Sequence, residues 1–243
     1  MQSSSSIKMK LFKGLRQKLI REGNLKRYFI YAVGEILLVM IGISLAFQVS
    51  NWDNNRIKKN SENRYYENIR DQIIDDKELI QGQKDFNNYY LPQFNYAKEI
   101  IEANDIGKMD TLGKIIRNLT QYSDFDKQGN IYETMVNSGE IKLLQNLAIV
   151  NGIRELEEIY NYVNRMENIH YDAMMQHAVV SINPVIKYSE STIQKPDDVY
   201  TYQFQNLIII LMQIMDEKNN TYDEALDEIE RVIKLIDEEL TSR

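Results

Sequence analysis

The two histidines of the chain are the first candidates for metal ligands. His170 and His177 stand seven residues apart, a spacing that places both on one face of a helix. Metal-binding helices more often use a spacing of four, and seven residues separate the rings by about 10 Å, too far for one ion. The absence of cysteine excludes disulfides, zinc–thiolate sites, thiol nucleophiles and iron–sulfur clusters. We therefore expect no metal and no cofactor.

Other reactive side chains are numerous but form no catalytic signature. The sixteen tyrosines include pairs such as Tyr65–Tyr66, whose amphipathic rings suit the seams of a helical bundle; a tyrosine-lined ligand pocket is the alternative. The acidic run from Asp223 to Glu230 is typical of a solvated helix face. Gly139 lacks the flanking glycines of a phosphate loop. The sequence thus predicts a protein that is not an enzyme.

Glu35 is the only formal charge in an apolar stretch that extends from Tyr28 to Val49. A helix of this length reaches about 33 Å, enough to cross a hydrocarbon core of about 30 Å. A carboxyl group inside a membrane costs on the order of 3 kcal/mol and is normally protonated, paired or turned toward protein. We therefore expect Glu35 to face another helix.

The helical wheel shows which residues share the face of Glu35. Gly42 and Ala46 form a small-x3-small pair on this face, which lets a second helix approach closely. The predicted helix–helix interface in the membrane consists of Tyr31, Glu35, Val39, Gly42 and Ala46. We expect the chain to form a homo-oligomer through this face.

The flanks of the apolar stretch are typical of membrane boundaries. Lys26, Arg27 and Tyr28 suit one boundary, and Trp52 suits the other. The stretch is longer than the core of a cleaved signal peptide, and no small-x-small cleavage site follows it. Residues 28–49 are therefore predicted to form an uncleaved transmembrane helix.

Residues 1–27 form a basic head, with eight Lys or Arg against one Glu and a net charge of +7. Leu11, Phe12, Leu15 and Leu19 fall within about 100° on a helical wheel, the pattern of a helix that lies on a lipid surface. Attraction to anionic lipids contributes about 1 kcal/mol per basic residue near the surface. We expect these residues to contact lipid, with a regulatory protein partner as the alternative.

Residues 50–243 form an acidic body, with 21 Lys or Arg against 34 Asp or Glu and a net charge of −13. Basic residues beside a span favour the cytoplasmic side, so the head is expected inside and the body outside. A surface of this charge does not suit nucleic acid, which requires clustered positive charge.

Apolar periodicity in the body predicts an all-α fold: one N-terminal transmembrane helix followed by a soluble antiparallel helical bundle with long and short helices. The span can continue as one helix into the first long helix of the body, which Pro92 should kink or split. Short helices are predicted at 111–121, capped by Asp110, and at 130–137, closed at Gly139, with a loop at 123–129 between them.

A second long helix is predicted from Asn146 to Ile182, followed by a loop at 189–198. The run at 207–215 is apolar nearly all round and is interpreted as the buried centre of the bundle, since it is too short to span a membrane. Residues 219–221 either cap a separate last helix or interrupt one.

Two stretches resemble a known family. The residues RYFIYAVGEILLVMIGISLAFQVSNWDNNR at 27–56 are similar to the N-terminal hallmark of an uncharacterised family of Bacteroidota membrane proteins, and residues 132–144 resemble its second recurring stretch. Met135 and Asn137 replace the commoner Leu and Ser of that stretch, and Ser50 and Asp53 replace Asn residues around the tryptophan. The resemblance implies a bacterial inner membrane and supplies no activity.

These observations predict a membrane-anchored periplasmic helical interaction or scaffold protein. Its expected partners are the lipid bilayer, a second copy of itself and another membrane or periplasmic protein. Two alternatives remain: a component of an energy-coupled membrane complex in which Glu35 carries protons, and a small-molecule sensor with a four-helix-type input bundle.

Overall fold

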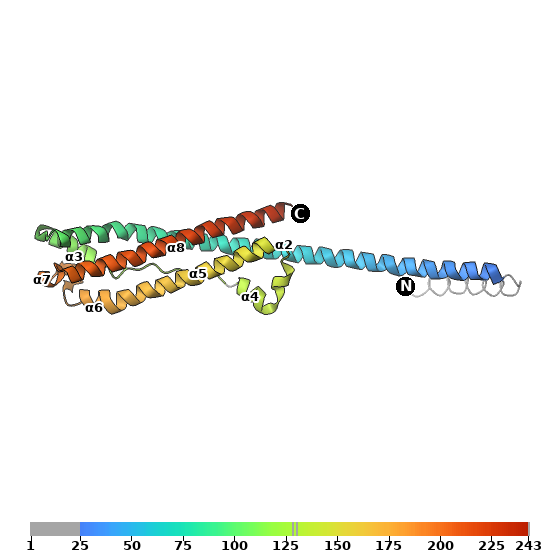
Figure 1. The fold of residues 1–243 in the computed structure, drawn as a ribbon, viewed down its shortest axis with the longest axis horizontal. Helices are drawn as coiled ribbons and strands as arrows, with labels where there is room; N and C mark the ends of the chain where they lie inside the picture. The colour runs from blue at the N-terminus through green and yellow to red at the C-terminus, as the bar shows by residue number, and fades with distance from the viewer. Residues whose placement is uncertain (1–24, 128, 130, 243) are drawn as a thin grey trace. The chain divides into compact units, whose positions relative to one another are not determined.

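The computed structural model describes residues 25–127, 129 and 131–242, and it is all-α, with 84% of residues in helices (Figure 1). Its contacts divide the chain into two compact units, Met1–Asn60 and Ser61–Arg243, and α2 contributes residues to both. The α-helices are α2 (Leu25–Glu102), α3 (Met109–Asn118), α4 (Ile131–Ser138), α5 (Leu147–Ala173), α6 (Val179–Ile182), α7 (Pro196–Val199) and α8 (Tyr202–Thr241).

The described part of the first unit is a single stretch of α2. Helix α2 includes the predicted span at 28–49 and continues without a break past residue 60. Residues 53–56, which follow Trp52, contain no Pro or Gly that would end the helix. The segment is long and apolar enough to cross a membrane: its most apolar window has a mean hydropathy of 2.1, and none of that window is buried. Most of the predicted amphipathic head lies outside the described residues.

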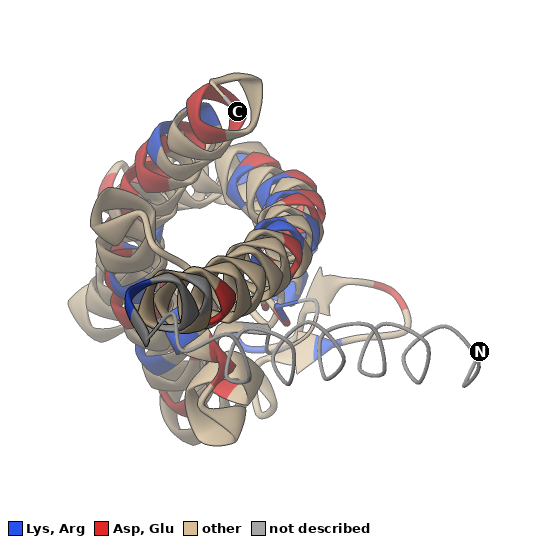
Figure 2. Ribbon diagram, turned by 90° about the vertical axis from the view of Figure 1, so that its right-hand side faces the viewer, with Lys and Arg blue, Asp and Glu red and all other residues tan. Residues whose placement is uncertain are grey.

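The second unit is built on three long helices, namely α2 from Ser61 onward, α5 and α8. Buried positions recur at alternating steps of four and three on each helix, the heptad pattern that makes side chains interlock along a shared seam. On α2 one row of this pattern comprises Tyr66, Ile73, Ile80, Asn87, Phe94 and Ile101. Acidic and basic residues are interspersed along the helices of the structure (Figure 2).

Side-chain pairs fix the directions of the three helices. Residue numbers rise on α2 as they fall on α8 in the pairs Arg70–Asp237 and Lys77–Glu230, so these two helices are antiparallel. Helices α5 and α8 are antiparallel by the same criterion, from the pairs Asn146–Glu239, Glu155–Arg231 and Tyr162–Glu217.

Helices α2 and α5 instead run parallel. Glu62 accepts a hydrogen bond from the amide of Gln145, and the hydroxyl of Tyr66 accepts one from the amide of Asn146, so numbers rise together on both helices. The segment between α3 and α4 allows α5 to run parallel to α2, because residues 121–127 return along the bundle without helical structure (Figure 1). The antiparallel arrangement therefore holds for α8 with each of its two long neighbours.

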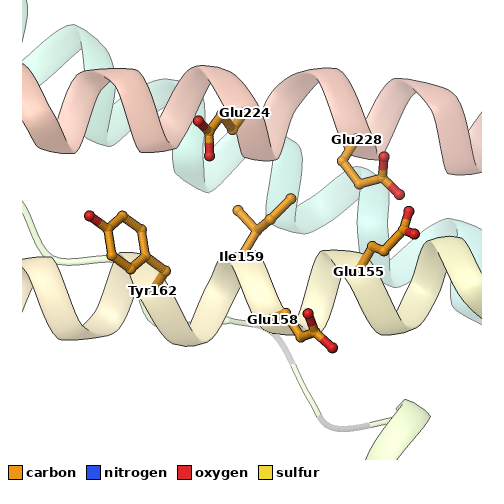
Figure 3. A pocket seen from close by; sticks show the side chains of 6 residues that line it. All are labelled: Glu155, Glu158, Ile159, Tyr162, Glu224 and Glu228. Carbon is orange, nitrogen blue, oxygen red and sulfur yellow. The ribbon is translucent and has the colours of Figure 1, made fainter.

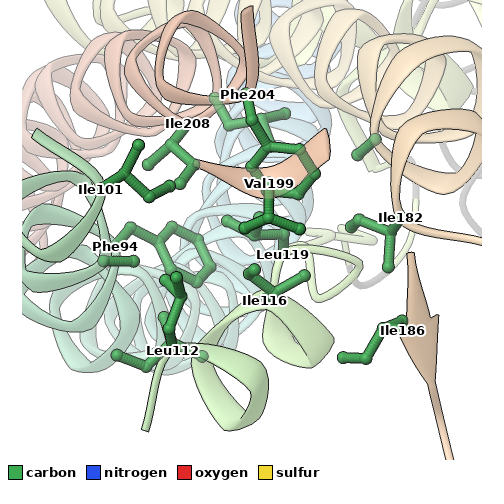
Figure 4. Close-up of a cluster of buried hydrophobic side chains, with 14 of the residues drawn as sticks. Phe94, Ile101, Leu112, Ile116, Leu119, Ile182, Ile186, Val199, Phe204 and Ile208 are labelled. Carbon is green, nitrogen blue, oxygen red and sulfur yellow. The ribbon is translucent and has the colours of Figure 1, made fainter. Parts of the chain in front are cut away.

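Two hydrophobic clusters fill the second unit. One contains Phe94, Leu112, Ile182 and Phe204 together with other side chains of α2, α3, α6, α7 and α8 (Figure 4). The other is formed by α2, α5 and α8 with Phe125 of the 121–127 segment. Both clusters contain side chains of α2 and α8, and α5 contributes buried side chains to the second cluster.

Pro92 neither ends nor splits α2, contrary to the second of the two predicted outcomes. Proline removes one backbone donor, but Phe94, Ala97 and Ile100 immediately after it are all buried in the first cluster. The burial of these side chains outweighs the single hydrogen bond that the helix loses.

The beginning of α3 also differs from the prediction. The helix starts at Met109 with Lys108 in the capping position, so Asp110 lies in its first turn and is not its cap. A carboxylate in the first turn is still favourable, since it faces the positive end of the helix dipole.

The C-terminal half contains two further departures. The predicted loop at 189–198 includes part of a two-stranded hairpin, β1 (Ile186–Lys187) with β2 (Thr192–Ile193), and the short α7. The hairpin lies close against α3, because a Cβ on Gly113 would come within 2.3 Å of the carbonyl oxygen of Ser191. The last helix, α8, is continuous through residues 219–221.

The apolar run at 207–215 is only partly buried. Ile208, Leu211 and Met215 are fully covered, but Ile210 keeps 51% of its surface exposed. The interpretation of the whole run as a buried centre was therefore wrong for this chain, because a three-helix bundle covers one face of α8 and leaves the opposite face open.

Candidate functional site

The predicted membrane interface lies on the described part of α2. Glu35, Val39, Gly42 and Ala46 are all exposed within this single chain. A Cβ built on Gly42 meets nothing within 4 Å. The side chain of Tyr31, the fifth predicted member, is outside the described part of the structure.

The structure describes the side chains of two of the four residues predicted to lie at the membrane boundaries. Lys26 is exposed, and Trp52 is 66% exposed with the guanidinium of Arg56 5.5 Å from its ring centre. The side chains of Arg27 and Tyr28 are not described. The four predicted lipid-contacting residues of the head, Leu11, Phe12, Leu15 and Leu19, also lie outside the described residues.

A buried polar layer separates the two hydrophobic clusters of the second unit. Its residues come from all three long helices and from the 121–127 segment. The layer consists of Asn87, Ser123, Glu167, His170, Lys218 and Tyr222, none of which is more than 4% exposed. Buried charged groups are costly unless they are paired and hydrogen-bonded, so this layer is the most unusual chemical feature of the bundle.

Glu167 lies at the centre of the layer. Its Oε1 accepts hydrogen bonds from the backbone amide of Phe125 at 2.8 Å and from the hydroxyl of Tyr222 at 2.5 Å. Its Oε2 is buried and has no hydrogen-bond partner among the described residues. Burial raises the pKa of this carboxyl well above its usual value, although Tyr222 and Lys218 act to lower it.

Lys218 provides the opposite charge. Its Nζ donates a hydrogen bond to the carbonyl oxygen of Ser123 at 2.6 Å and lies 3.5 Å from Nδ1 of His170. Burial lowers the pKa of Lys218, and burial together with the nearby ammonium lowers the pKa of His170 to about 3. His170 is therefore neutral near pH 7, and its Nδ1 can accept a hydrogen bond from the ammonium group of Lys218.

Neutral side chains connect the layer to α2. The hydroxyl of Ser123 donates to Oδ1 of Asn87 at 2.9 Å, and Nδ2 of Asn87 donates to Oδ1 of Asn219 at 3.0 Å. The hydroxyl of Tyr222 lies 3.2 Å from Oγ of Ser123. These contacts join α2, the 121–127 segment and α8 into one network.

The sequence contained a signal for this layer that the analysis of motifs missed. Asn87 and Lys218 each occupy a position in a row of otherwise apolar residues spaced by seven, and Glu167 and His170 are consecutive seam positions on α5. Polar residues at such positions fix the register of helical bundles at a cost in stability. Sequence reasoning assigned His170 no partner in such a layer.

The two histidines do not share an environment, contrary to the prediction that they stack on one face. His170 is 1% exposed, whereas His177 is exposed. A π-helical segment, Met174–Ala178, follows α5 directly and moves the buried position to Ala178. The extra residue in this turn rotates His177 away from the seam.

A cavity of about 410 Å³ lies between α5 and α8, and carboxylates dominate its lining (Figure 3). Arg231 reaches across the groove and pairs with Glu155 at 2.8 Å and with Glu228 at 2.6 Å. The complete lining is Glu155, Glu158, Ile159, Tyr162, Glu224 and Glu228. An open groove of this charge suits contact with basic groups of a partner.

Comparison of the chain with protein-family models, with curated proteins and with solved structures finds no match. The family resemblance of residues 27–56 and 132–144 therefore stays a prediction from those residues.

Proposed function

We propose that this protein is a membrane-anchored helical interaction protein that associates with a second copy through the apolar segment of α2 and presents its bundle in the periplasm. The observation that carries the proposal is the exposed apolar segment with Glu35 on the same face as Gly42. Lipid can cover the apolar side chains, but it leaves the carboxyl group without a partner.

A second copy meets this need. The open space above Gly42 and the small side chain of Ala46, four residues later, allow two helix backbones to approach closely. Glu35, when protonated, then donates a hydrogen bond to the neighbouring helix. Polar contacts of this kind contribute about 1 kcal/mol each between membrane helices.

The bundle supports a role in interaction. Several of its buried polar side chains form a layer that is closed to solvent, and the cavity between α5 and α8 is an open acidic groove. Such a surface can contact a periplasmic or membrane partner with basic groups, while the anchor keeps the two proteins at the same membrane.

The mass of the detergent-solubilised full chain tests the proposal. Wild-type protein should be an oligomer, and Gly42→Leu should shift it toward the monomer because the larger side chain blocks close approach. Gly34→Leu is the matched control, since Gly34 has the same open surroundings but lies on another face of the helix. A monomeric wild type, or equal assembly of the Gly34 and Gly42 variants, would contradict the proposal.

Substitutions of Glu35 distinguish a structural role of this residue from a role in energy coupling. Glu35→Gln keeps a donor and an acceptor but cannot titrate, so the oligomer should persist, whereas Glu35→Ala should weaken it by about 1 kcal/mol per contact. Proton flux into liposomes that the wild type supports and Glu35→Gln abolishes would instead favour the energy-coupled alternative.

A further inference from the structure

The backbone of the 121–127 segment is held by side chains of the three long helices. The amide of Asp124 donates to Oε1 of Gln83 at 3.0 Å, and the amide of Phe125 donates to Oε1 of Glu167 at 2.8 Å. The carbonyl oxygen of Ser123 accepts from Nζ of Lys218 at 2.6 Å. From Tyr122 to Lys127 the backbone makes no hydrogen bond to another described backbone group, so these three side chains fasten its backbone. The side-chain pairs Ser123–Asn87 and Lys127–Glu157 add to this attachment.

Two of the three fastening side chains are ionisable and buried. Glu167 keeps one carboxylate oxygen without a partner among the described residues, and Lys218 is 1% exposed. A charged carboxylate in such a place loses hydration that its hydrogen bonds replace only in part. Addition of a proton removes this cost, while Oε1 can still accept from the amide of Phe125.

Glu167 and Lys218 are the two groups of the layer that change charge, Glu167 near neutral pH and Lys218 at more alkaline pH. His170 on α5 stays neutral because its pKa is lowered to about 3, and burial raises the pKa of Tyr222 on α8, which also stays neutral. Asp124 of the segment adds negative charge that raises the pKa of both Glu167 and Lys218. Helix α2 contributes the uncharged side chains of Asn87 and Gln83.

We propose that the polar layer is a proton-operated latch, in which a proton on Glu167 holds residues 121–127 against the bundle and loss of that proton loosens them. Release of the segment would open the carboxyl to water and remove its hydrogen bond to the Phe125 amide. The segment links α3 to α4 and carries Phe125 into the second hydrophobic cluster, so the latch controls a connection between the two clusters.

The direction of the pH dependence follows from proton linkage. The pKa of Glu167 is raised in the closed state, so this state binds more protons than the open one and gains stability as pH falls through that pKa. The pKa of Lys218 is lowered, so lysine works in the opposite direction, but mainly at alkaline pH, where the open state is still protonated and the closed state is not. From pH 8 to pH 5.5 the carboxyl dominates, and the closed state is favoured.

Hydrogen exchange at the amides of Asp124 and Phe125 measures this opening in the full chain in detergent. After correction for the intrinsic pH dependence of exchange, protection at both amides should rise about fivefold or more from pH 8 to pH 5.5. The amides of Ile80 and Ile229, in the helices beside the second cluster, should change much less. Glu167→Gln should abolish the rise, and Glu158→Gln, an exposed glutamate on the same helix, should keep it.

Either of two results would overturn the latch. One is protection at Phe125 that does not change with pH in the wild type or that changes as much at Ile80 and Ile229, which indicates a global effect. The other is a Glu167→Gln variant with the same pH dependence as the wild type. If Glu167→Gln fails to fold, the comparison of segment and helix amides in the wild type decides the question by itself.

Discussion

Gly82 and Gly152 show how the same residue type serves different needs in two long helices. Gly82 is exposed on α2, and a Cβ there would meet nothing within 4 Å. Gly152 is buried on α5, where a Cβ would lie 2.8 Å from Cγ2 of Val232 and 3.0 Å from Nη2 of Arg231. The missing side chain at Gly152 therefore allows α5 and α8 to pack closely.

Alanine substitutions at these two glycines should have opposite effects. Gly82→Ala should raise the free energy of unfolding by about 1 kcal/mol, because alanine favours the helix over glycine. Gly152→Ala should lower it by about 1 to 3 kcal/mol, because Val232 must move in a packed seam. Urea unfolding followed by circular dichroism measures both, and a stabilising Gly152→Ala would show that the seam has room.

Local signals in the sequence predicted the end of α4 at Gly139, but they gave α3 the wrong cap and did not predict burial. Gly139 has the left-handed conformation, with φ of 76°, and Asn146, where the second long helix was predicted to begin, accepts hydrogen bonds from the amides of Ala148 and Ile149 at the start of α5. Both features depend on neighbouring residues alone. The burial of Lys218 depends on α2, α5 and the 121–127 segment together, so residues far apart in the chain decide it.

At the scale of elements, α2 shows how packing overrides a local rule. Pro92 stands inside the helix with its ring exposed, and the helix continues to Glu102. The parallel direction of α2 and α5 likewise depends on a connection without periodicity, which hydrophobic patterns do not predict. The long helices themselves were predicted because their heptad spacing is visible in the sequence.

Replacement of Pro92 should therefore stabilise the bundle. Pro92→Ala restores a backbone donor and removes a poor helix former, so the free energy of unfolding should rise by roughly 1 to 3 kcal/mol. Glu78→Ala, at another exposed position of α2, is the control and should change it by less than about 0.5 kcal/mol. A loss of stability in Pro92→Ala, measured by urea unfolding, would mean that the proline makes a favourable contribution to this helix.

At the scale of the whole molecule, the chain combines an exposed apolar helix with an acidic bundle that has its own core. The two hydrophobic clusters lie entirely within residues 61–243. Contacts begin the second unit at Ser61, whereas the body was predicted to begin at residue 50.

The bundle should fold without the anchor. Residues 56–243, produced without the head and the apolar segment, should be soluble and strongly helical by circular dichroism, because the buried side chains of both clusters are all present. Analytical ultracentrifugation of this fragment should give a lower degree of association than the full chain in detergent. Recovery only as aggregate, or a spectrum typical of β-sheet, would count against a self-contained bundle.

In the proposed topology, α2 anchors the chain in a membrane with the basic head in the cytoplasm and the acidic bundle outside. Its most direct test is a pair of reporters fused after Arg243 in a Gram-negative host. A reporter that is active only in the periplasm should be active, and one that is active only in the cytoplasm should be silent, because basic residues before the span favour retention of the head inside. The reverse pattern would contradict this topology, and activity of the cytoplasmic reporter in the soluble fraction would contradict membrane anchorage itself.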